Sequence, residues 1–225
     1  MDGASKPGDD EDMEGSGTLS HDARLLWDAA EGLARMAHPV SGRTLPPLLF
    51  FTDPARTPEP WRTIERLPRG GGVVFRHFGA VDAEATARRL KAIAVERGLV
   101  LLIGLDVQLA GRVAADGVHL PERALGQAAA LRTRRPEWII TGAAHSPEIA
   151  LAANGLDAVV LSPIFPAGGA SSVKPALGLE VLKTVTERRP VYALGGIGPE
   201  TVGGLALSGA IGIAGVDAIQ DAFAV

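Results

Sequence analysis

From residue 48 onward, short apolar runs alternate with segments that show helical periodicity. The apolar runs cover residues 48–51, 72–76, 99–103, 117–119, 138–141, 158–161, 191–194 and 210–214. Parallel strands need a crossover connection between them, and a helix is the usual one. Eight such repeats predict an α/β chain that folds as a (β/α)8 TIM barrel.

The segments between these runs are the expected helices. They cover residues 61–67, 82–97, 107–113, 121–134, a helix opened by Ser146-Pro147-Glu148, 179–187, 199–208 and a short helix from 217. A doubly wound sheet is the rival fold, but it requires a glycine fingerprint after the first strand. Thr52-Asp53-Pro54 stands at that place, so the barrel is the preferred prediction. Gly142, directly after the run 138–141, is expected to begin a turn.

One further helix precedes the barrel, over residues 21–37, with Ser20 as its expected N-cap. Its apolar residues recur at helical spacing and are Leu25, Leu26, Ala29, Leu33 and Met36. We expect this face to cover the bottom or flank of the barrel, near the seam left by the short eighth helix. A subunit interface is the less favoured use.

The charge is concentrated at the N-terminus. Residues 1–17 carry six acidic side chains against Lys6, a net charge of −5, whereas the whole chain carries −4. The remainder is therefore close to neutral, which argues against nucleic acid as a partner. We expect three parts: a disordered acidic tail (1–17), the N-terminal helix and linker (18–47) and the barrel (48–225).

Composition limits the compartment and the chemistry. The chain has no cysteine, which excludes disulfides, thiolate metal sites and a thiol nucleophile. No apolar run approaches the roughly 20 residues that span a bilayer, and the acidic N-terminus lacks the features of a signal peptide. The sequence thus predicts a cytoplasmic protein without a membrane partner.

Polar side chains at the carboxyl ends of the strands are the candidates for chemistry, because TIM-barrel active sites form there. The candidates are Asp53, Arg76, His77, Asp106, His119, His145, Ser162, Lys174 and the Gly195-Gly196 turn. His145 is the leading proton carrier, since it precedes a helix N-terminus that favours a neutral imidazole. The alternatives are that His145 only caps or packs this turn, and that His119 is a core imidazole.

The glycine turn, residues 194–198, follows the seventh strand and can bring backbone N–H groups close to an anion. A tight turn that merely requires glycine is the alternative. Arg76 offers a planar fork for phosphate or carboxylate, with a surface salt bridge as the alternative. Lys174 lies on a Gly/Ser-rich loop of the kind that can close over a ligand.

Five short motifs carry a resemblance to a known family. They are Phe51-Thr52-Asp53, the ADGVHL element at 115–120, His145-Ser146, the SPIFP element at 162–166 and the ALGGI element at 193–197. Over roughly residues 48–222 the chain resembles the thiamine phosphate synthase/TenI family of barrels. The resemblance implies a role in thiamine biosynthesis and a thiazole phosphate ligand, a phosphorylated heterocycle. Gly195, Gly196 and Gly215 would bind the phosphate, while Arg76, His119, Ser162 and Lys174 would contact the substrate.

The chain departs from the synthases where they bind pyrimidine pyrophosphate. The Gln-x-Arg-x-Lys pattern of strand 2 reads Val74, Arg76 and Phe78, so only the arginine remains. Leu105 replaces the first magnesium-binding aspartate, with Asp106 one place later. Pyrophosphate transfer needs Mg²⁺ and cationic donors.

Four further positions differ from the synthases. Asp116 matches the second magnesium ligand without its partner, Glu122 replaces a glutamine, Ala143 replaces a serine, and Lys174 alone remains of a Thr-x-Thr-Lys loop. These losses make the TenI branch, the thiazole tautomerases, the closer resemblance. In that branch His145 would be the acid/base.

Asp217 conflicts with both branches, because the family has serine in this turn beside the phosphate. A carboxylate there requires either that its side chain points away or that the ligand is not a phosphate.

The preferred hypothesis is a TenI-like enzyme that needs no cofactor and transfers a proton on a thiazole phosphate through His145. The first alternative is a divergent thiamine phosphate synthase, which would require Mg²⁺. The second is a non-catalytic barrel that binds a metabolite or a protein. A homo-oligomer is compatible with the sequence, which does not fix the oligomeric state.

Overall fold

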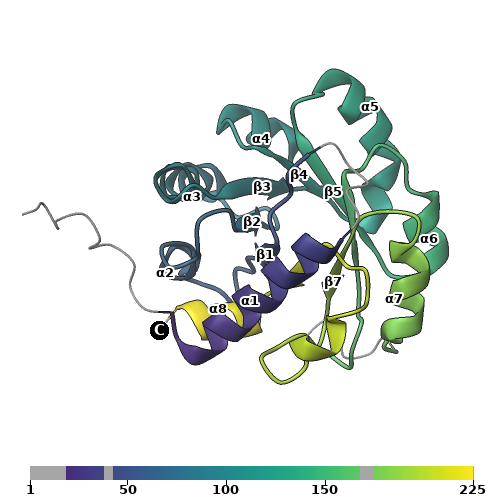
Figure 1. The fold of residues 1–225 in the computed structure, drawn as a ribbon. Helices are drawn as coiled ribbons and strands as arrows, with labels where there is room; N and C mark the ends of the chain where they lie inside the picture. Colours follow the sequence, from purple (N-terminus) through teal and green to yellow (C-terminus); the bar gives the residue numbers. More distant parts are fainter. Residues whose placement is uncertain (1–18, 38–42, 168–174, 225) are drawn as a thin grey trace, which may run out of the picture.

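The computed structural model describes residues 19–37, 43–167 and 175–224, which form a closed barrel of parallel strands surrounded by helices (Figure 1). The strands are β1 Leu48–Phe51, β2 Gly72–Phe75, β3 Val100–Gly104, β4 Gly117–Leu120, β5 Ile139–Ala144, β6 Ala158–Leu161, β7 Val191–Leu194 and β8 Gly212–Gly215. Each strand pairs with the next along the chain, and β8 pairs with β1. The predicted TIM barrel is confirmed.

The helices follow the predicted order but not always the predicted type. They are α1 His21–Met36, α2 Pro60–Ile64, α3 Ala83–Arg97, α4 Val107–Arg112, the 3-10 helix η1 Glu122–Gln127, α5 Ala128–Arg134, α6 Pro147–Ala152, α7 Gly178–Thr186, the 3-10 helix η3 Val202–Leu205 and α8 Asp217–Phe223. The continuous helices predicted over 121–134 and 199–208 are wrong. Gly126 in the first segment and the pair Gly203-Gly204 in the second disfavour a continuous α-helix.

Strand β5 is longer than the apolar run 138–141 indicates, so the turn predicted at Gly142 is wrong. The strand continues to Ala144, which pairs with Leu161 of β6, and close packing rather than a turn accounts for the glycine at position 142. A Cβ atom placed there would lie 2.4 Å from the Leu125 side chain. His145 consequently follows the last residue of the strand directly.

The core has two layers, as the alternation of side chains along a strand requires. One layer fills the barrel interior and consists of Leu49, Phe51, Val74, Leu102, Ala158, Val160, Tyr192 and Ala214. The other layer lies between the strands and the helices. The Tyr192 hydroxyl donates a hydrogen bond of 2.6 Å to the Pro46 carbonyl at the amino-terminal end of the barrel.

Helix α1 packs across the seam between β1 and β8, beside α8 and η3, as expected (Figure 1). Ser20 is its N-cap, accepting a hydrogen bond from the Ala23 N–H and donating another of 2.8 Å to the Ala222 carbonyl of α8. The predicted buried face is partly wrong, since Leu25 and Met36 are exposed. The buried positions of α1 are Ala23, Leu26, Trp27, Ala30 and Leu33. The acidic tail lies outside the described residues.

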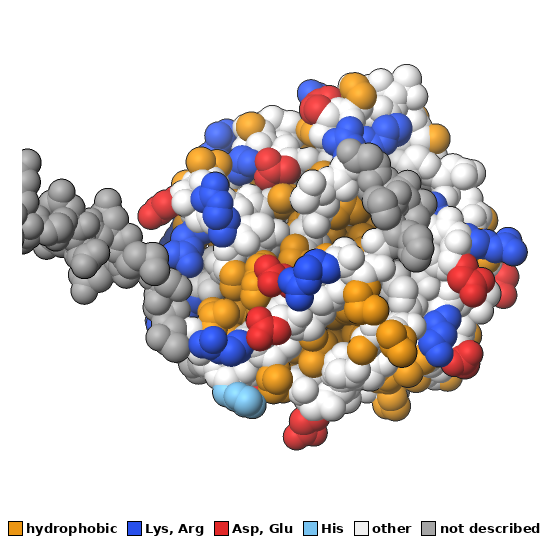
Figure 2. All heavy atoms as spheres, in the orientation of Figure 1, with side chains coloured by type: hydrophobic (Ala, Val, Ile, Leu, Met, Phe, Trp, Pro, Cys, Tyr) orange, Lys and Arg blue, Asp and Glu red, His pale blue; other side chains and the backbone are white. Residues whose placement is uncertain are grey.

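Figure 2 shows charged side chains of both signs spread over the face seen in Figure 1, including a red and a blue side chain near its middle, with apolar side chains between them. In the part of the chain that the structure describes, no helix has both the length and the apolar character needed to cross a membrane.

Candidate active site

The predicted site residues lie at or directly after the carboxyl ends of their strands. Arg76 follows β2, His119 lies in β4, His145 follows β5, Ser162 follows β6, Gly195 and Gly196 follow β7, and Gly215 ends β8. Parallel strands in a closed barrel present all these ends on one face. Lys174 lies outside the described residues, so its predicted role stays a prediction.

His145 and Ser162 are in direct contact although they follow different strands. The His145 Nδ1 atom lies 2.9 Å from the Ser162 carbonyl oxygen and 3.1 Å from the Ser162 hydroxyl. Pairing of Ala144 with Leu161 in adjacent strands places these two residues side by side. Ser162 is almost completely buried, so it provides a fixed partner for the ring.

This contact defines which imidazole nitrogen is available. A carbonyl oxygen can only accept, so the Nδ1 atom of His145 carries a proton and donates it to Ser162. In the neutral ring the lone pair is then on Nε2, which has no hydrogen-bond partner among the described residues. The contact therefore fixes the tautomer of the ring, and the predicted role of His145 as acid/base stays a prediction.

The backbone of His145 is held separately from its ring. The Glu122 carboxylate accepts a hydrogen bond of 2.7 Å from the His145 N–H. Helix α6 is capped by Ser146, whose hydroxyl accepts from the Ile149 N–H at 3.3 Å. Since Ser146 provides the cap, His145 does not cap this helix, whereas the alternative that it only packs the turn stays open.

His119 is a buried imidazole. It is only 6% exposed, its Nδ1 atom lies 3.0 Å from the Thr141 hydroxyl, and its ring lies nearly perpendicular to the Phe51 ring, with centroids 4.8 Å apart. Burial, with a smaller contribution from the Arg76 charge, lowers the pKa of His119 to about 3. Its predicted contact with substrate stays a prediction.

Acid should destabilise the fold through His119. An unfolded chain binds a proton on this imidazole below a pKa of about 6.5, whereas the folded barrel excludes it until about pH 3. As the pH is lowered from about 6.5 to about 3, the free energy of unfolding should therefore fall by about 1.4 kcal/mol per pH unit. Urea titrations at several pH values test this: His119→Asn should show a shallower dependence, and equal slopes would contradict it.

Arg76 is fixed at the mouth of the barrel. Its Nε atom donates to the Thr52 carbonyl at 2.7 Å, and its Cζ atom lies 5.4 Å from the ring centroids of Phe51 and Phe78. Its Nη2 atom is buried, 3.6 Å from the Asp53 carboxylate, and has no hydrogen-bond partner among the described residues. Burial lowers the pKa of Arg76. The guanidinium thus retains an unused donor.

The neighbouring loops are less polar than in a diphosphate site. Phe78 (φ 46°) and Leu105 (φ 65°) occupy the left-handed region, which is uncommon for such residues. Both are exposed apolar side chains, at 71% and 39%. His77, which precedes Phe78, approaches Asp106, which follows Leu105, with Nε2 3.6 Å from the carboxylate.

The glycine turn packs against the SPIFP element. Gly195 (φ 95°) and Gly196 (φ 66°) both adopt left-handed backbone conformations. A Cβ atom on Gly195 would lie 2.8 Å from Pro163, and one on Gly196 would lie 2.5 Å from the Pro166 carbonyl. Conformation and close packing alone therefore require glycine here, so phosphate binding by this turn stays a prediction.

Asp217 is paired with an arginine that the sequence analysis did not single out. Arg56, in the connection between β1 and α2, donates to the Asp217 carboxylate through Nε at 2.8 Å and also through Nη2. No motif marks Arg56, because the two residues are 161 positions apart in the chain.

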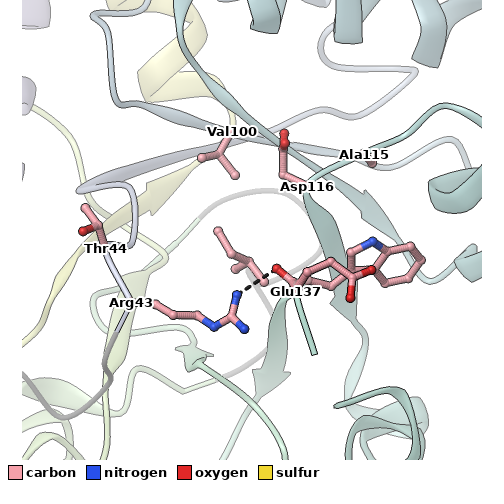
Figure 3. Close-up of a pocket in the computed structure, with 8 residues that line it drawn as sticks. Arg43, Thr44, Val100, Ala115, Asp116 and Glu137 are labelled. Carbon is pink, nitrogen blue, oxygen red and sulfur yellow. Dashed lines mark hydrogen bonds between the residues drawn. The ribbon is translucent and has the colours of Figure 1, made fainter. Parts of the chain in front are cut away.

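The opposite end of the barrel contains a hollow of about 460 Å³ (Figure 3). Arg43 extends across it and donates a hydrogen bond of 2.8 Å to the Glu137 carbonyl. Asp116 also lines this hollow, at the amino-terminal start of β4. Its carboxylate accepts from Lys91 and from the Leu101 N–H, both at 2.8 Å. The suggested match of Asp116 to a magnesium ligand is wrong, because it lies at the far end from His145.

Known proteins share both the sequence pattern and the fold. The family model described as thiamine monophosphate synthase matches residues 49–219. "Putative thiamine-phosphate synthase 2" of Aquifex aeolicus is 36% identical over 181 residues, covering 76% of this chain and 96% of that protein. Thiamine-phosphate synthase of Bacillus mycoides is 29% identical over 200 residues, covering 84% and 91%.

A solved structure of a protein with a related name has a similar fold. Thiamine phosphate pyrophosphorylase from Pyrococcus furiosus superposes with a TM-score of 0.67 at 25% sequence identity, covering 79% of this chain and 91% of that one. The family match spans most of the barrel, from β1 into α8. The chain belongs to the thiamine monophosphate synthase family.

Proposed function

We propose that this barrel catalyses a proton transfer that aromatises a thiazole phosphate tautomer, with His145 as the acid/base. The observation that carries the proposal is the hydrogen bond from His145 Nδ1 to the Ser162 carbonyl. This bond fixes the tautomer and orientation of the ring and leaves the Nε2 lone pair available.

This reaction requires one base that can remove a proton and return it. Nε2 removes a proton from a ring carbon, and the electron pair left behind completes the aromatic system of the thiazole. The protonated imidazole then returns a proton to another atom of the conjugated substrate, so the atoms balance as an isomerisation. The nearby Ser162 hydroxyl, 3.1 Å from Nδ1, helps to hold the ring while its charge changes.

The anionic groups of the substrate would be bound on either side of His145. Backbone N–H groups of the glycine turn and of Gly215 would bind the phosphate. Arg76, with its unused buried donor, and Lys174 would orient the substrate. Thiazole phosphate is the phosphorylated heterocycle that this arrangement fits.

A magnesium ion, as the synthase reaction requires, does not fit the residues that the structure describes. Asp106 caps α4 by accepting from the Leu109 N–H at 2.8 Å, and Leu105 supplies no ligand. Asp116 lies at the other end of the barrel and is bound to Lys91. In the described ranges no group of three acidic or histidine side chains could hold a metal ion. We therefore assign no step to magnesium.

The second candidate function is thiamine-phosphate synthase. The observation in its favour is the name of the relatives, since the proteins from Aquifex aeolicus and Bacillus mycoides are both named for that activity. Their matches extend over more than nine-tenths of their own length.

One set of assays with the purified protein separates these functions. Conversion of the thiazole phosphate tautomer to the aromatic isomer, followed by its ultraviolet absorbance without added metal, would support the proposal. Formation of thiamine phosphate from pyrimidine pyrophosphate, thiazole phosphate and Mg²⁺ would establish the synthase instead. Absence of both reactions, together with no binding of thiazole phosphate in calorimetry, would favour a non-catalytic barrel.

A further inference from the structure

We propose that Arg56 binds the substrate phosphate and determines the preference of the site for phosphorylated ligands, a role that rests on the proposed function. The inference starts from the ion pair between Arg56 and Asp217, which joins the β1–α2 connection to the first residue of α8. This pair occupies the corner where an unpaired carboxylate would repel phosphate.

The geometry of the pair leaves part of the guanidinium unused. Arg56 uses Nε, at 2.8 Å, and Nη2 to bind the two Asp217 oxygens. Its Nη1 atom has no hydrogen-bond partner among the described residues, so its two N–H groups can donate to a further anion. A planar guanidinium can bind one anion along one edge and a second through its remaining donors.

Arg56 is held in place by its backbone as well as by its side chain. Its N–H donates to the Asp53 carboxylate at 3.2 Å, and its carbonyl accepts from Gln220 Nε2 at 3.1 Å. Its side chain is 35% exposed, which leaves the guanidinium accessible. A donor that is already oriented loses little conformational freedom when it binds.

The pair lies beside the predicted phosphate-binding backbone. Gly198 of the glycine turn packs near Ala218, because a Cβ atom on Gly198 would lie 3.8 Å from the Ala218 Cβ. Ala218 follows Asp217 directly, and Gly215 lies two residues before Asp217. One phosphate bound at this corner would therefore lie near the glycine turn, Gly215 and the Arg56–Asp217 pair.

Electrostatics resolve the conflict that Asp217 poses. The hydrogen bonds that Arg56 donates to Asp217 raise the pKa of Arg56 further above its ordinary value, so the guanidinium stays charged. The ion pair adds no net negative charge to the corner, and the Nη1 donors of the 35% exposed Arg56 side chain are available to an added anion. Asp217 therefore serves to orient Arg56, and it need not be absent for phosphate to bind.

Calorimetry with two ligands tests this assignment. Thiazole phosphate and the corresponding unphosphorylated thiazole alcohol are titrated into the wild type, Arg56→Met, and Arg56→Met combined with Asp217→Ser. We expect Arg56→Met to weaken thiazole phosphate by about tenfold to a hundredfold, the effect of a lost charge-assisted hydrogen bond. Its affinity for the alcohol should equal that of the wild type. Removing Asp217 as well should restore part of the lost affinity.

Arg62→Met is the matched control, since Arg62 lies on α2, is exposed and pairs with Glu59. It removes the same charge and should leave both affinities unchanged. The assignment is overturned if Arg56→Met weakens both ligands equally or neither. If the wild type binds neither ligand, the proposed function fails as well, whereas binding that does not depend on Arg56 overturns the role of Arg56 alone.

Discussion

Replacing His145 with alanine should lower kcat for thiazole phosphate isomerisation by about 10²–10⁴-fold, the usual contribution of a general acid or base. The proton acceptor is lost in this variant. The Ser162 carbonyl and hydroxyl, which hold the His145 ring in the wild type, contact no other base that could replace it among the described residues. Steady-state kinetics followed by ultraviolet absorbance measure the effect.

The same variant should bind thiazole phosphate about as well as the wild type. An interaction that forms only during proton transfer contributes to the transition state and not to ground-state binding. Added imidazole should restore part of the activity, because alanine leaves space where the ring was. A merely structural role for His145 would give neither the rescue nor unchanged affinity in calorimetry.

His77 provides a matched control on the same face of the barrel. Its ring lies against Asp106 and accepts a hydrogen bond from the Gly79 N–H at 3.0 Å. His77→Ala removes an imidazole of the same size from the loop after β2 and should leave kcat near the wild-type value. Unchanged turnover in His145→Ala, or an equal loss in both variants, would remove His145 from the mechanism.

The sequence alone was sufficient to predict the barrel and the position of His145. Apolar runs such as 158–161 match strands residue for residue, because a strand buried on both faces contains few polar side chains. Ser146-Pro147-Glu148 marked the start of α6, and His145 had to precede it. In a closed barrel of parallel strands, a residue that directly follows a strand lies on the face formed by the carboxyl ends of all the strands, and this placed His145 there.

Contacts between distant loops could not be predicted in this way. The pairs Arg56–Asp217 and Glu122–His145 depend on how two connections approach each other in space, and neither has a local sequence pattern. The helix predicted over 199–208 failed for a different reason, since packing against the barrel holds a segment with two glycines in 3-10 geometry. Asp116 could have been placed correctly from the sequence, because it directly precedes the predicted strand 117–119 and therefore lies at the amino-terminal end of that strand.

At the end of the barrel opposite His145, Asp157 should make a large contribution to stability. It is 9% exposed, accepts a hydrogen bond of 2.7 Å from the Ile140 N–H, and pairs with Arg132. Removing one partner of a buried ion pair leaves the other charge uncompensated, which costs about 3–5 kcal/mol. Asp157→Ala should lower the free energy of unfolding by about this amount in urea titrations.

Asp116 is the natural control, because it holds the same position before β4 that Asp157 holds before β6. Each aspartate directly precedes its strand, β4 or β6, and accepts from a backbone N–H of the strand before, Leu101 for Asp116. The Asp116 side chain is 36% exposed against 9% for Asp157, so water can replace part of what Lys91 and Leu101 lose. Asp116→Ala should therefore cost about 1–2 kcal/mol, the penalty for an incompletely buried partner. Equal losses in the two variants would show that burial does not set the strength of these carboxylate contacts.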